Sequence, residues 1–491
     1  TLKDTPGVGA ISDLSGNYKI KVNNAAKDIL VFSYIGMRTQ EIHVKGKTVI
    51  NVTLQSDAKA LDEVVVVGYG TSKRSDLTGS VVSVKSEDLM KMPTSDVTQA
   101  LAGRVAGVQI TQSEGAPGST ISIRVRGGIS ITQSNEPLYI IDGFPSEDGM
   151  STIDPAEIET IDILKDASAT AIYGARGANG VVVITTKRGN KDGSKMSISF
   201  DSYVGVKTLA RKLPVLSTKE FVLLDYERRL QFDGEAGVKN FQSIYGSFLD
   251  INENYGNYAG IDWQEETLGR TTTSQNYRVR ISGGNKELQY SLNYTYFKDL
   301  GAMLYSGNDK HNISFSLSHN PTKRISVNAR VNYDQTYIYG MGTSDQSTRF
   351  NKMEHILQYR PTKGIYGDDE SLLKSEEDNI TDEEGNPMQN PLTSAAEETN
   401  KRQLRTFQAN GGLIFNIAKG LSFRNNTGMR YQTTRNDVFY GEKSSNGKRS
   451  SANGYIQYAE NSSFQTSNVL NYEYKKKKHK LIAMLGQEWV S

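Results

Sequence analysis

From about residue 195 onward, apolar and polar side chains alternate one for one. In "LQYSLNYTY" (288–296), leucine and tyrosine alternate with glutamine, serine, asparagine and threonine, and "NYRVRIS" and "RISVNARVNY" keep the same period. A period of two is typical of β-strands that turn one face to apolar surroundings and the other to polar groups. The pattern predicts nine strands, at 195–208, 273–283, 287–299, 310–319, 323–338, 403–416, 420–434, 462–474 and 478–490.

The connections between these strands alternate in length. Runs of about 64, ten, 64 and 27 residues alternate with the tight turns "GNK", "NPT", "IAK" and "KKK". A soluble sandwich has no reason to make every second connection minimal, whereas a transmembrane barrel has tight periplasmic turns and long extracellular loops. We therefore expect a mainly β protein in which residues 195–491 form part of an outer-membrane barrel. The apolar faces would contact lipid and the polar faces would line the lumen.

Three other segments precede the first barrel strand. Residues 1–55 contain short strand patterns about ten residues apart, which indicates a small β-sandwich. Residues 56–76 are polar on both sides of four valines and have the composition of a linker. Residues 77–189 mix strand patterns with helix-start signals, so we predict a compact α/β domain there.

Two helix starts are predicted in this α/β domain. Ser95 is expected to cap a helix whose buried face carries Val97, Leu101 and Val105. In "DPAE" (154–157), the aspartate is the expected cap, the proline takes the first helical position and the glutamate stands where a capping box needs it.

The size of the α/β domain limits which barrel could enclose it. Nine strands about 4.8 Å apart and tilted about 40° would close to a backbone radius of only about 9 Å. A compact domain of about 113 residues has a gyration radius near ~13 Å and a hard radius of about 17 Å. Enclosing it takes a backbone radius of about 22 Å, or roughly 22 strands. The chain is therefore expected to be the N-terminal portion of a larger plugged barrel.

Composition and motif content argue against several other classes of protein. The chain has no cysteine, and its five histidines lack metal-ligand spacing. The 57 basic and 55 acidic residues nearly cancel, which is unlike a nucleic-acid-binding domain. The glycines of "YGARGANG" (173–180) precede a strand and lack a Gly-Lys-Ser/Thr ending, so a tight turn is favoured over a phosphate-binding loop. We expect no enzyme, cofactor or metal site.

Five long motifs together resemble one protein family. They are "DEVVVVGYGTSKRSDLTGSV", "ALAGRVAGVQI", "ISIRVRGG", "PLYIIDGFP" and "IETIDILKDASATAIYGARGANGVVVITTKRG". The set resembles the SusC/RagA family of TonB-dependent outer-membrane transporters, and the match runs through the whole chain in order. The resemblance implies a partial carboxypeptidase-regulatory-like domain at 1–55, a plug domain at 77–189 and the first strands of the barrel from 195. It also implies import of oligosaccharides or peptides beneath a SusD-like lipoprotein, driven by TonB with its ExbB/ExbD energising complex.

The four valines lie in the segment that this resemblance identifies as the TonB box. The segment comprises Asp62, Glu63, Val64, Val65, Val66, Val67, Gly68, Tyr69 and Gly70. Because polar linkers flank it, we expect a strand with no internal partner that adds to a sheet edge of TonB in the periplasm. Four or five main-chain hydrogen bonds at about 1 kcal/mol each would couple the two proteins reversibly. The alternative is that the valines form a strand of the first domain.

Some polar residues of the predicted plug are further candidates. Arg124 and Arg126 are expected on one strand face, where contacts with the barrel wall or with plug acids are favoured over a ligand role. Asp142 and Gly143 are a hairpin-turn signal more than a catalytic site. The acidic stretch 367–387 lacks the spacing of an EF-hand and is expected to be a solvated extracellular loop.

Other functions are kept as alternatives. A surface receptor or adhesin would only display loops, and it would have no use for a plug and a coupling strand. A siderophore- or vitamin-type receptor would share both features with an importer of oligosaccharides. A signalling transducer would carry a βαβ domain before the TonB box, whereas residues 1–55 have an all-β pattern.

Overall fold

A computed structural model of the chain describes residues 2–491 with gaps. The residues outside the description are 3–8, 11, 14–15, 23, 26–27, 34–38, 55–63, 68–69, 74–80, 92–93, 95, 113–114, 120, 128–129, 131, 133, 147–148, 167–169, 190–195, 341–351, 375–379, 382–386, 445–446, 448–450 and 477–478. The chain divides into two compact units, Thr1–Thr78 and Gly79–Ser491. No helix among the described residues is long and apolar enough to cross a membrane.

The first unit contains two small sheets. Strands β1 (Ile29–Phe32) and β2 (Gln40–His43) pair antiparallel. Their core is formed by Leu2, Leu30 and Val44, which are all buried. The second small sheet consists of β3 (Val64–Val67) and β4 (Gly70–Lys73), also antiparallel.

The second unit begins with a five-stranded mixed sheet in the order β5-β10-β11-β8-β9. Strands β11 and β8 are parallel and the other neighbours are antiparallel. The strands are β5 (Val81–Lys85), β8 (Leu138–Ile141), β9 (Phe144–Ser146), β10 (Ile158–Leu164) and β11 (Val181–Thr186). The hairpin β6–β7 (Val108–Gln112, Ile121–Val125) and the helices α1 (Ser86–Leu89) and α2 (Val97–Ala100) share one apolar core with this sheet. The isoleucines and valines of β10 and β11 are buried on both faces, as in sheets that are covered on both sides.

The caps of the two predicted helix starts differ from expectation. Asp96 is the cap of α2, accepting hydrogen bonds from the Thr98 and Gln99 backbone N–H groups, so the assignment to Ser95, which lies outside the described residues, was wrong. Asp154 is a cap as predicted, but it starts only the 3₁₀ turn η2 (Pro155–Glu157). Glu157 closes no capping box there, because its carboxylate binds an arginine far away in the sequence.

The glycine-rich segment 173–180 forms a turn, as predicted. It lies in and just after the 3₁₀ segment η3 (Ala171–Gly177) and leads directly into β11. Gly180 has a φ of 92°, and a Cβ on it would meet the Val125 side chain at 3.0 Å. Only glycine fits this position without strain.

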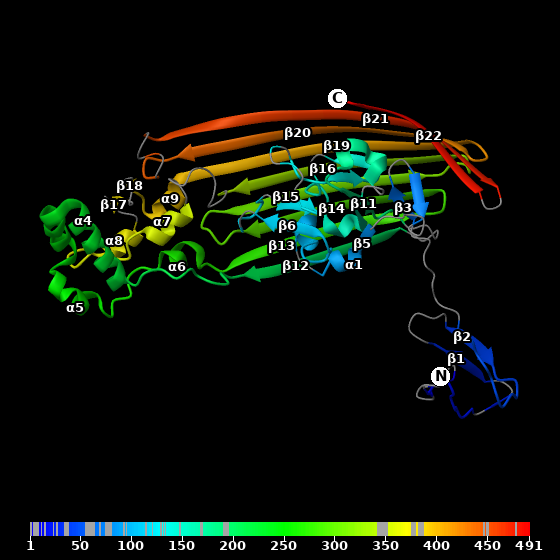
Figure 1. Cartoon of the computed structure of the whole chain (residues 1–491), viewed down its shortest axis with the longest axis horizontal. Helices are drawn as coiled ribbons and strands as arrows, with labels where there is room; N and C mark the ends of the chain where they lie inside the picture. The colour runs from blue at the N-terminus through cyan, green and yellow to red at the C-terminus, as the bar shows by residue number, and fades with distance from the viewer. Residues whose placement is uncertain are drawn as a thin grey trace. The chain divides into compact units, whose positions relative to one another are not determined.

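All nine predicted barrel strands are present in one antiparallel sheet. Figure 1 shows them side by side in chain order, β12-β13-β14-β15-β16-β19-β20-β21-β22. They span Ser197–Lys207, Thr272–Gly284, Leu288–Leu300, Gly307–His319, Ile325–Tyr339, Glu398–Ala418, Leu421–Tyr440, Asn453–Lys476 and His479–Val490. Strands β19, β20 and β21 run several residues past their predicted ends, so the connection expected at 435–461 is only 441–452.

The two faces of this sheet differ as the alternation predicts. Asn276, Asn312 and Asn332 are almost fully buried, on the face that packs against the plug. On the other face, Phe315 and Val331 are each 40% exposed. The alternation therefore describes a sheet with a polar side toward the plug and an apolar side away from it.

The two longest connections contain helices that the sequence analysis did not predict. Residues 208–271 form α4 (Thr218–Tyr245), η4 (Phe248–Asp250), α5 (Ile251–Tyr255) and α6 (Trp263–Leu268). Residues 340–397 form α7 (Lys352–Gln358), α8 (Asp369–Leu373), the short strands β17 (Ile380–Thr381) and β18 (Pro387–Met388), and α9 (Pro391–Glu397). Figure 1 shows these helices together at one end of the sheet.

These helices have apolar cores of their own. Trp263 of the first connection packs with Ile356, Tyr359, Leu372 and Met388 of the second. The Trp263 indole N–H also donates to the Arg360 carbonyl at 2.8 Å. Leu372 is fully buried, so the expectation of a purely solvated loop at 367–387 was wrong for its first turn, α8.

Candidate functional site

The valine strand β3 has an internal partner. Its four residues pair with β4, from Val64 opposite Lys73 to Val67 opposite Gly70. The expectation of an unpaired strand was therefore wrong. The sheet has only these two strands among the described residues, and an isolated two-stranded hairpin is marginally stable in water. One edge of β3 is thus open to another strand. Asp62, Glu63, Gly68 and Tyr69 lie outside the described residues.

Asp142 and Gly143 form the two-residue turn between β8 and β9. Ile141 pairs with Phe144 across it, and both turn residues have positive φ, 50° and 93°, as a type I′ turn requires. The Asp142 carboxylate accepts hydrogen bonds from the Thr186 backbone N–H at 2.9 Å and from its hydroxyl at 2.6 Å. Asp142 therefore links the turn to the end of β11.

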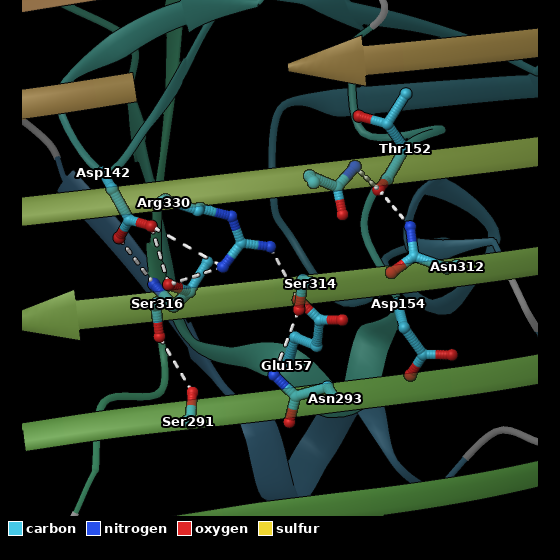
Figure 2. Close-up of polar contacts among 12 residues, drawn as sticks. Asp142, Thr152, Asp154, Glu157, Ser291, Asn293, Asn312, Ser314, Ser316 and Arg330 are labelled. Carbon is cyan, nitrogen blue, oxygen red and sulfur yellow. Dashed lines mark hydrogen bonds and ion pairs between the residues drawn. The ribbon is translucent and has the colours of Figure 1, made fainter. Parts of the chain in front are cut away.

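Arg330 of β16 reaches from the sheet into the plug. Figure 2 shows its guanidinium between Glu157 and Asp142, at 2.6 Å and 4.0 Å from the two carboxylates. It also donates to the Thr186 hydroxyl at 3.1 Å. Both Arg330 and Glu157 are buried. Because removing one partner of a buried ion pair leaves the other charge uncompensated, this contact ties plug and sheet together strongly.

A second ion pair lies on the other side of η2. Arg278 of β13 is 3.0 Å from the carboxylate of Asp154, and both residues are buried. Two asparagines of neighbouring strands, Asn312 and Asn332, donate to the Thr152 carbonyl at 2.9 and 3.2 Å. Residues 152–157 of the plug are thus bound to three strands of the sheet, β13, β15 and β16.

The two plug arginines singled out in the sequence lie apart. Arg124 is an exposed residue of β7. Arg126 follows the strand with a positive φ of 60°, so the two do not share a strand face as expected. Arg126 forms an ion pair with Asp166 of the plug. Its partner is therefore a plug acid, one of the two structural contacts that the sequence analysis favoured over a ligand role.

Sequence reasoning missed a buried ion pair between the plug and the sheet. Arg330 and Glu157 are 173 positions apart in the sequence. The signal was the arginine itself, which falls on the polar side of "RISVNARVNY" among smaller polar residues. Nothing in the local pattern identifies which acid meets it.

A small cavity lies between plug and sheet beside this ion pair. Its volume is about 50 Å³, and Asp142, Thr186, Gln289, Asn328 and Arg330 are among its lining residues. That is enough for ordered water and far too little for an oligosaccharide.

Burial shifts the ionisation of groups in the plug and in the helical connection. Desolvation lowers the pKa of Lys187, whose ammonium donates to the Ala156 carbonyl at 2.8 Å beside η2. Burial and the neighbouring Glu136 carboxylate raise the pKa of Tyr139 well above its usual value. Burial also raises the pKa of Tyr245 to about 12. Both tyrosines are therefore protonated at neutral pH, and Lys187 loses its proton more readily than an exposed lysine does.

Two protein-family models match the first part of the chain. The TonB-dependent Receptor Plug Domain matches residues 73–181, which include β5, β8, β9 and β10 of the five-stranded sheet and end at the first residue of β11, and the CarboxypepD_reg-like domain matches residues 2–66. The TonB-dependent receptor P26 of Formosa agariphila is 35% identical over 441 residues, covering 89% of this chain and 42% of that protein. The TonB-dependent receptor SusC of Bacteroides thetaiotaomicron is 37% identical over 318 residues, covering 63% of this chain and 29% of that protein.

The chain belongs to the SusC/RagA family of TonB-dependent receptors. Its curated relatives are TonB-dependent receptors, in agreement with the expectation that the chain is not an enzyme. The family relation places it in an outer membrane. The chain spans less than half the length of the curated relatives that it matches.

Solved structures agree with this fold. The RagAB peptide importer in its open-open state superposes with a TM-score of 0.71 at 22% identity, covering 87% of this chain and 49% of that chain. The same importer in its closed-closed state gives a TM-score of 0.67 at 23% identity, covering 84% and 48%. At this identity the likeness concerns the fold alone.

Proposed function

We propose that the protein imports oligosaccharides or peptides across the outer membrane, driven by TonB. The observation that carries this proposal is the plug held to the polar face of the sheet by the Arg330–Glu157 and Arg278–Asp154 ion pairs. A passive display barrel has no need of a domain bound against its lumen wall. Import also needs a means of moving the plug, and the open edge of β3 supplies a strand to which TonB can add.

In this proposal TonB binds the valine strand β3 in the periplasm. The short turns of the sheet would face the same side and the helical connections would face the outside, as is usual for outer-membrane barrels. Nine strands leave two sheet edges, so the proposal includes a closed barrel of roughly 22 strands around the plug. The proposal keeps the predicted domain limits: the small β-sandwich at 1–55, the linker at 56–76, the plug at 77–189 and the barrel part at 195–491.

The test of import separates it from surface binding. Bacteria that carry or lack the gene are given fluorescent oligosaccharides and peptides, with and without an uncoupler of the proton-motive force. We expect uptake only with the gene and without the uncoupler, whereas binding at the cell surface should persist with both. Ligand binding without any energy-dependent uptake would favour the receptor or adhesin alternative.

A SusD-like lipoprotein is the proposed partner on the extracellular side. Three side chains of the helical connections, Phe232, Leu249 and Tyr366, are 75%, 87% and 82% exposed, which suits a surface that another protein covers. We expect a stable interface of more than about 2,000 Å². Purification from native membranes in mild detergent should recover the lipoprotein with the barrel.

The substitution Leu249→Asp should reduce recovery of the lipoprotein, because it places a charge in an apolar contact. Asp250→Asn, at the neighbouring position, serves as the matched control. Isolation of the unaltered barrel alone, from cells that make the lipoprotein, would count against this partner.

A further inference from the structure

Three polar side chains form a row across β19, β20 and β21, on the face of the sheet that the plug contacts. Gly428 of β20 faces the plug, because a Cβ on it would lie 3.2 Å from the Phe144 ring. Side chains alternate along a strand, so Asn436 of β20 projects from the same face. Its direct neighbours across the ladder are Arg402 on β19 and Gln457 on β21. We call Arg402, Asn436 and Gln457 the inner polar row.

The inner polar row lies beside a loop of the plug. On its other side, Arg402 pairs with Ile338 of β16, and a Cβ on Gly118 of the plug would meet the Ile338 side chain at 2.6 Å. Arg402 is also close to the start of β19, which follows directly after α9 at the helical end of the sheet (Figure 1). The row therefore begins where the plug touches the sheet and lies toward the helical connections.

The charge of Arg402 is not balanced as other charges on this face are. Each of four other cations has a carboxylate within ion-pair distance: Arg278 with Asp154, Arg330 with Glu157, Lys207 with Asp299, and Lys310 with Asp334. Within the described ranges of the chain, Arg402 forms no ion pair, although both strands next to β19 are present. Its guanidinium is therefore available to an anion from outside this chain.

Two atoms of the inner polar row are buried without a hydrogen-bond partner. They are the Nε donor of Arg402 and the Oδ1 acceptor of Asn436. The Asn436 Nδ2 group donates to the Gln457 Oε1 atom at 3.3 Å, which accounts for the other end of that amide. Because an unpaired buried polar group is costly, a ligand that supplies both an anion and a hydroxyl donor would gain from both atoms.

The wall around the inner polar row has hydrogen-bonding groups and positive charge. At the inward positions of 400–408, 430–438 and 455–463, the charged residues are Arg402 and Arg430, and most others are amides or hydroxyls. The carboxylates of these stretches, Asp437 and Glu460, occupy the alternate positions that face the other way. Amides and hydroxyls suit the hydroxyl groups of sugars, and the arginines attract anions.

We propose that Arg402 and Asn436 form a binding site for an acidic oligosaccharide. The Arg402 guanidinium holds a carboxylate or sulfate group, and a hydroxyl of the same sugar ring donates to the Asn436 Oδ1 atom. A sugar ring fixes these two groups relative to each other, so less conformational freedom is lost on binding than with the acidic side chain of a peptide. The inference rests on the proposed import function and narrows its substrate to anionic sugars.

Binding to the purified full-length protein tests this site. The probes are oligogalacturonates and sulfated galactan oligosaccharides, each beside its methyl-esterified or desulfated form, which keeps the chain and lacks the charge. At least one acidic series should bind about tenfold more tightly than its neutral form, and salt should weaken its binding. The two series distinguish a carboxylate from a sulfate as the recognised group.

The variant Arg402→Gln should bind the acidic probe about tenfold more weakly, because a charge-assisted hydrogen bond is lost, and should leave binding of the neutral form unchanged. Arg405→Gln is the matched control: it is the same substitution on the same strand, at an exposed position of the opposite face, and should bind normally. Arg402→Lys keeps the charge without the planar fork and should recover part of the affinity. Heat-dependent migration in gels would verify that each barrel is folded.

Several results would overturn the site. These are binding of the neutral forms alone, absence of binding to every acidic probe, equal affinities of the Arg402→Gln and Arg405→Gln variants, and preference for polyglutamate peptides over both acidic sugar series. Binding is measured without cells, so it can fail separately from import. Acidic sugars that bind without energy-dependent uptake would refute only import, and uptake restricted to neutral sugars would refute only the site.

Discussion

Replacing both Val65 and Val67 by proline should abolish energy-dependent uptake while surface expression and ligand binding stay intact. Proline has no N–H to donate to a neighbouring strand. At about 1 kcal/mol for each lost hydrogen bond, two prolines weaken the pairing of the valine strand with its neighbour by about 2 kcal/mol, roughly thirtyfold, so the strand conformation needed for coupling is lost. Uptake of labelled substrate by intact cells measures the effect. Undiminished transport by the double variant would show that the valines are not the coupling strand.

The hairpin seen for β3 sharpens this experiment. With Val67 and Gly70 as a hydrogen-bonded pair, the Val65 and Val67 N–H groups point to β4 and that of Val66 points to the open edge. Val66→Pro then blocks addition at the open edge while sparing the pairing with β4. The matched control is Val65→Thr/Val67→Thr, which keeps both donors and a β-branched side chain, and should transport normally.

Replacing Arg330 by methionine should destabilise the plug by about 3–5 kcal/mol, because the buried Glu157 carboxylate loses its counterion. Denaturant-dependent proteolysis of the plug in the purified protein measures this, with heat-dependent gel migration reporting on the barrel. Removing both charges, as Arg330→Met/Glu157→Met, should recover much of the loss, since no uncompensated charge is then buried.

Arg126→Met is the control for this experiment. Arg126 also pairs with a carboxylate, but its side chain is 55% exposed, so the pair contributes about 0–1 kcal/mol. We expect a clear difference between the two arginine variants. Equal effects of both would mean that the Arg330 contact does not hold the plug in place.

The strands and their order were predictable from the sequence because their signal is local. Each residue of "LQYSLNYTY" faces either the plug or the outside, so its polarity reports its side directly. The short turns were also predictable from local sequence, because two or three residues between alternating strands permit only a hairpin. The Asp142-Gly143 turn belongs here as well, because its residue types match the positive φ that it adopts.

Other features depended on contacts that no local pattern encodes. The apolar residues of α4 (Thr218–Tyr245) pack with those of α5. Trp263 of α6 packs with residues about a hundred positions later in the sequence. The same holds for Glu157, which looks like part of a capping box until β16 brings Arg330 to it. Local signals compete with tertiary contacts at such positions, and the buried ion pair is the stronger interaction.

The sequence by itself determined the alternating sheet, its tight turns and a separate domain preceding it, since each follows from side-chain period and turn chemistry. Only the tertiary structure decided which residues meet across the sheet. Asn425 and Thr427 interrupt the apolar face of one strand, Asn468 and Thr466 interrupt that of the next, and β-pairing brings the four together. Register joins residues more than forty positions apart, and it depends on the whole ladder of main-chain hydrogen bonds rather than on either residue.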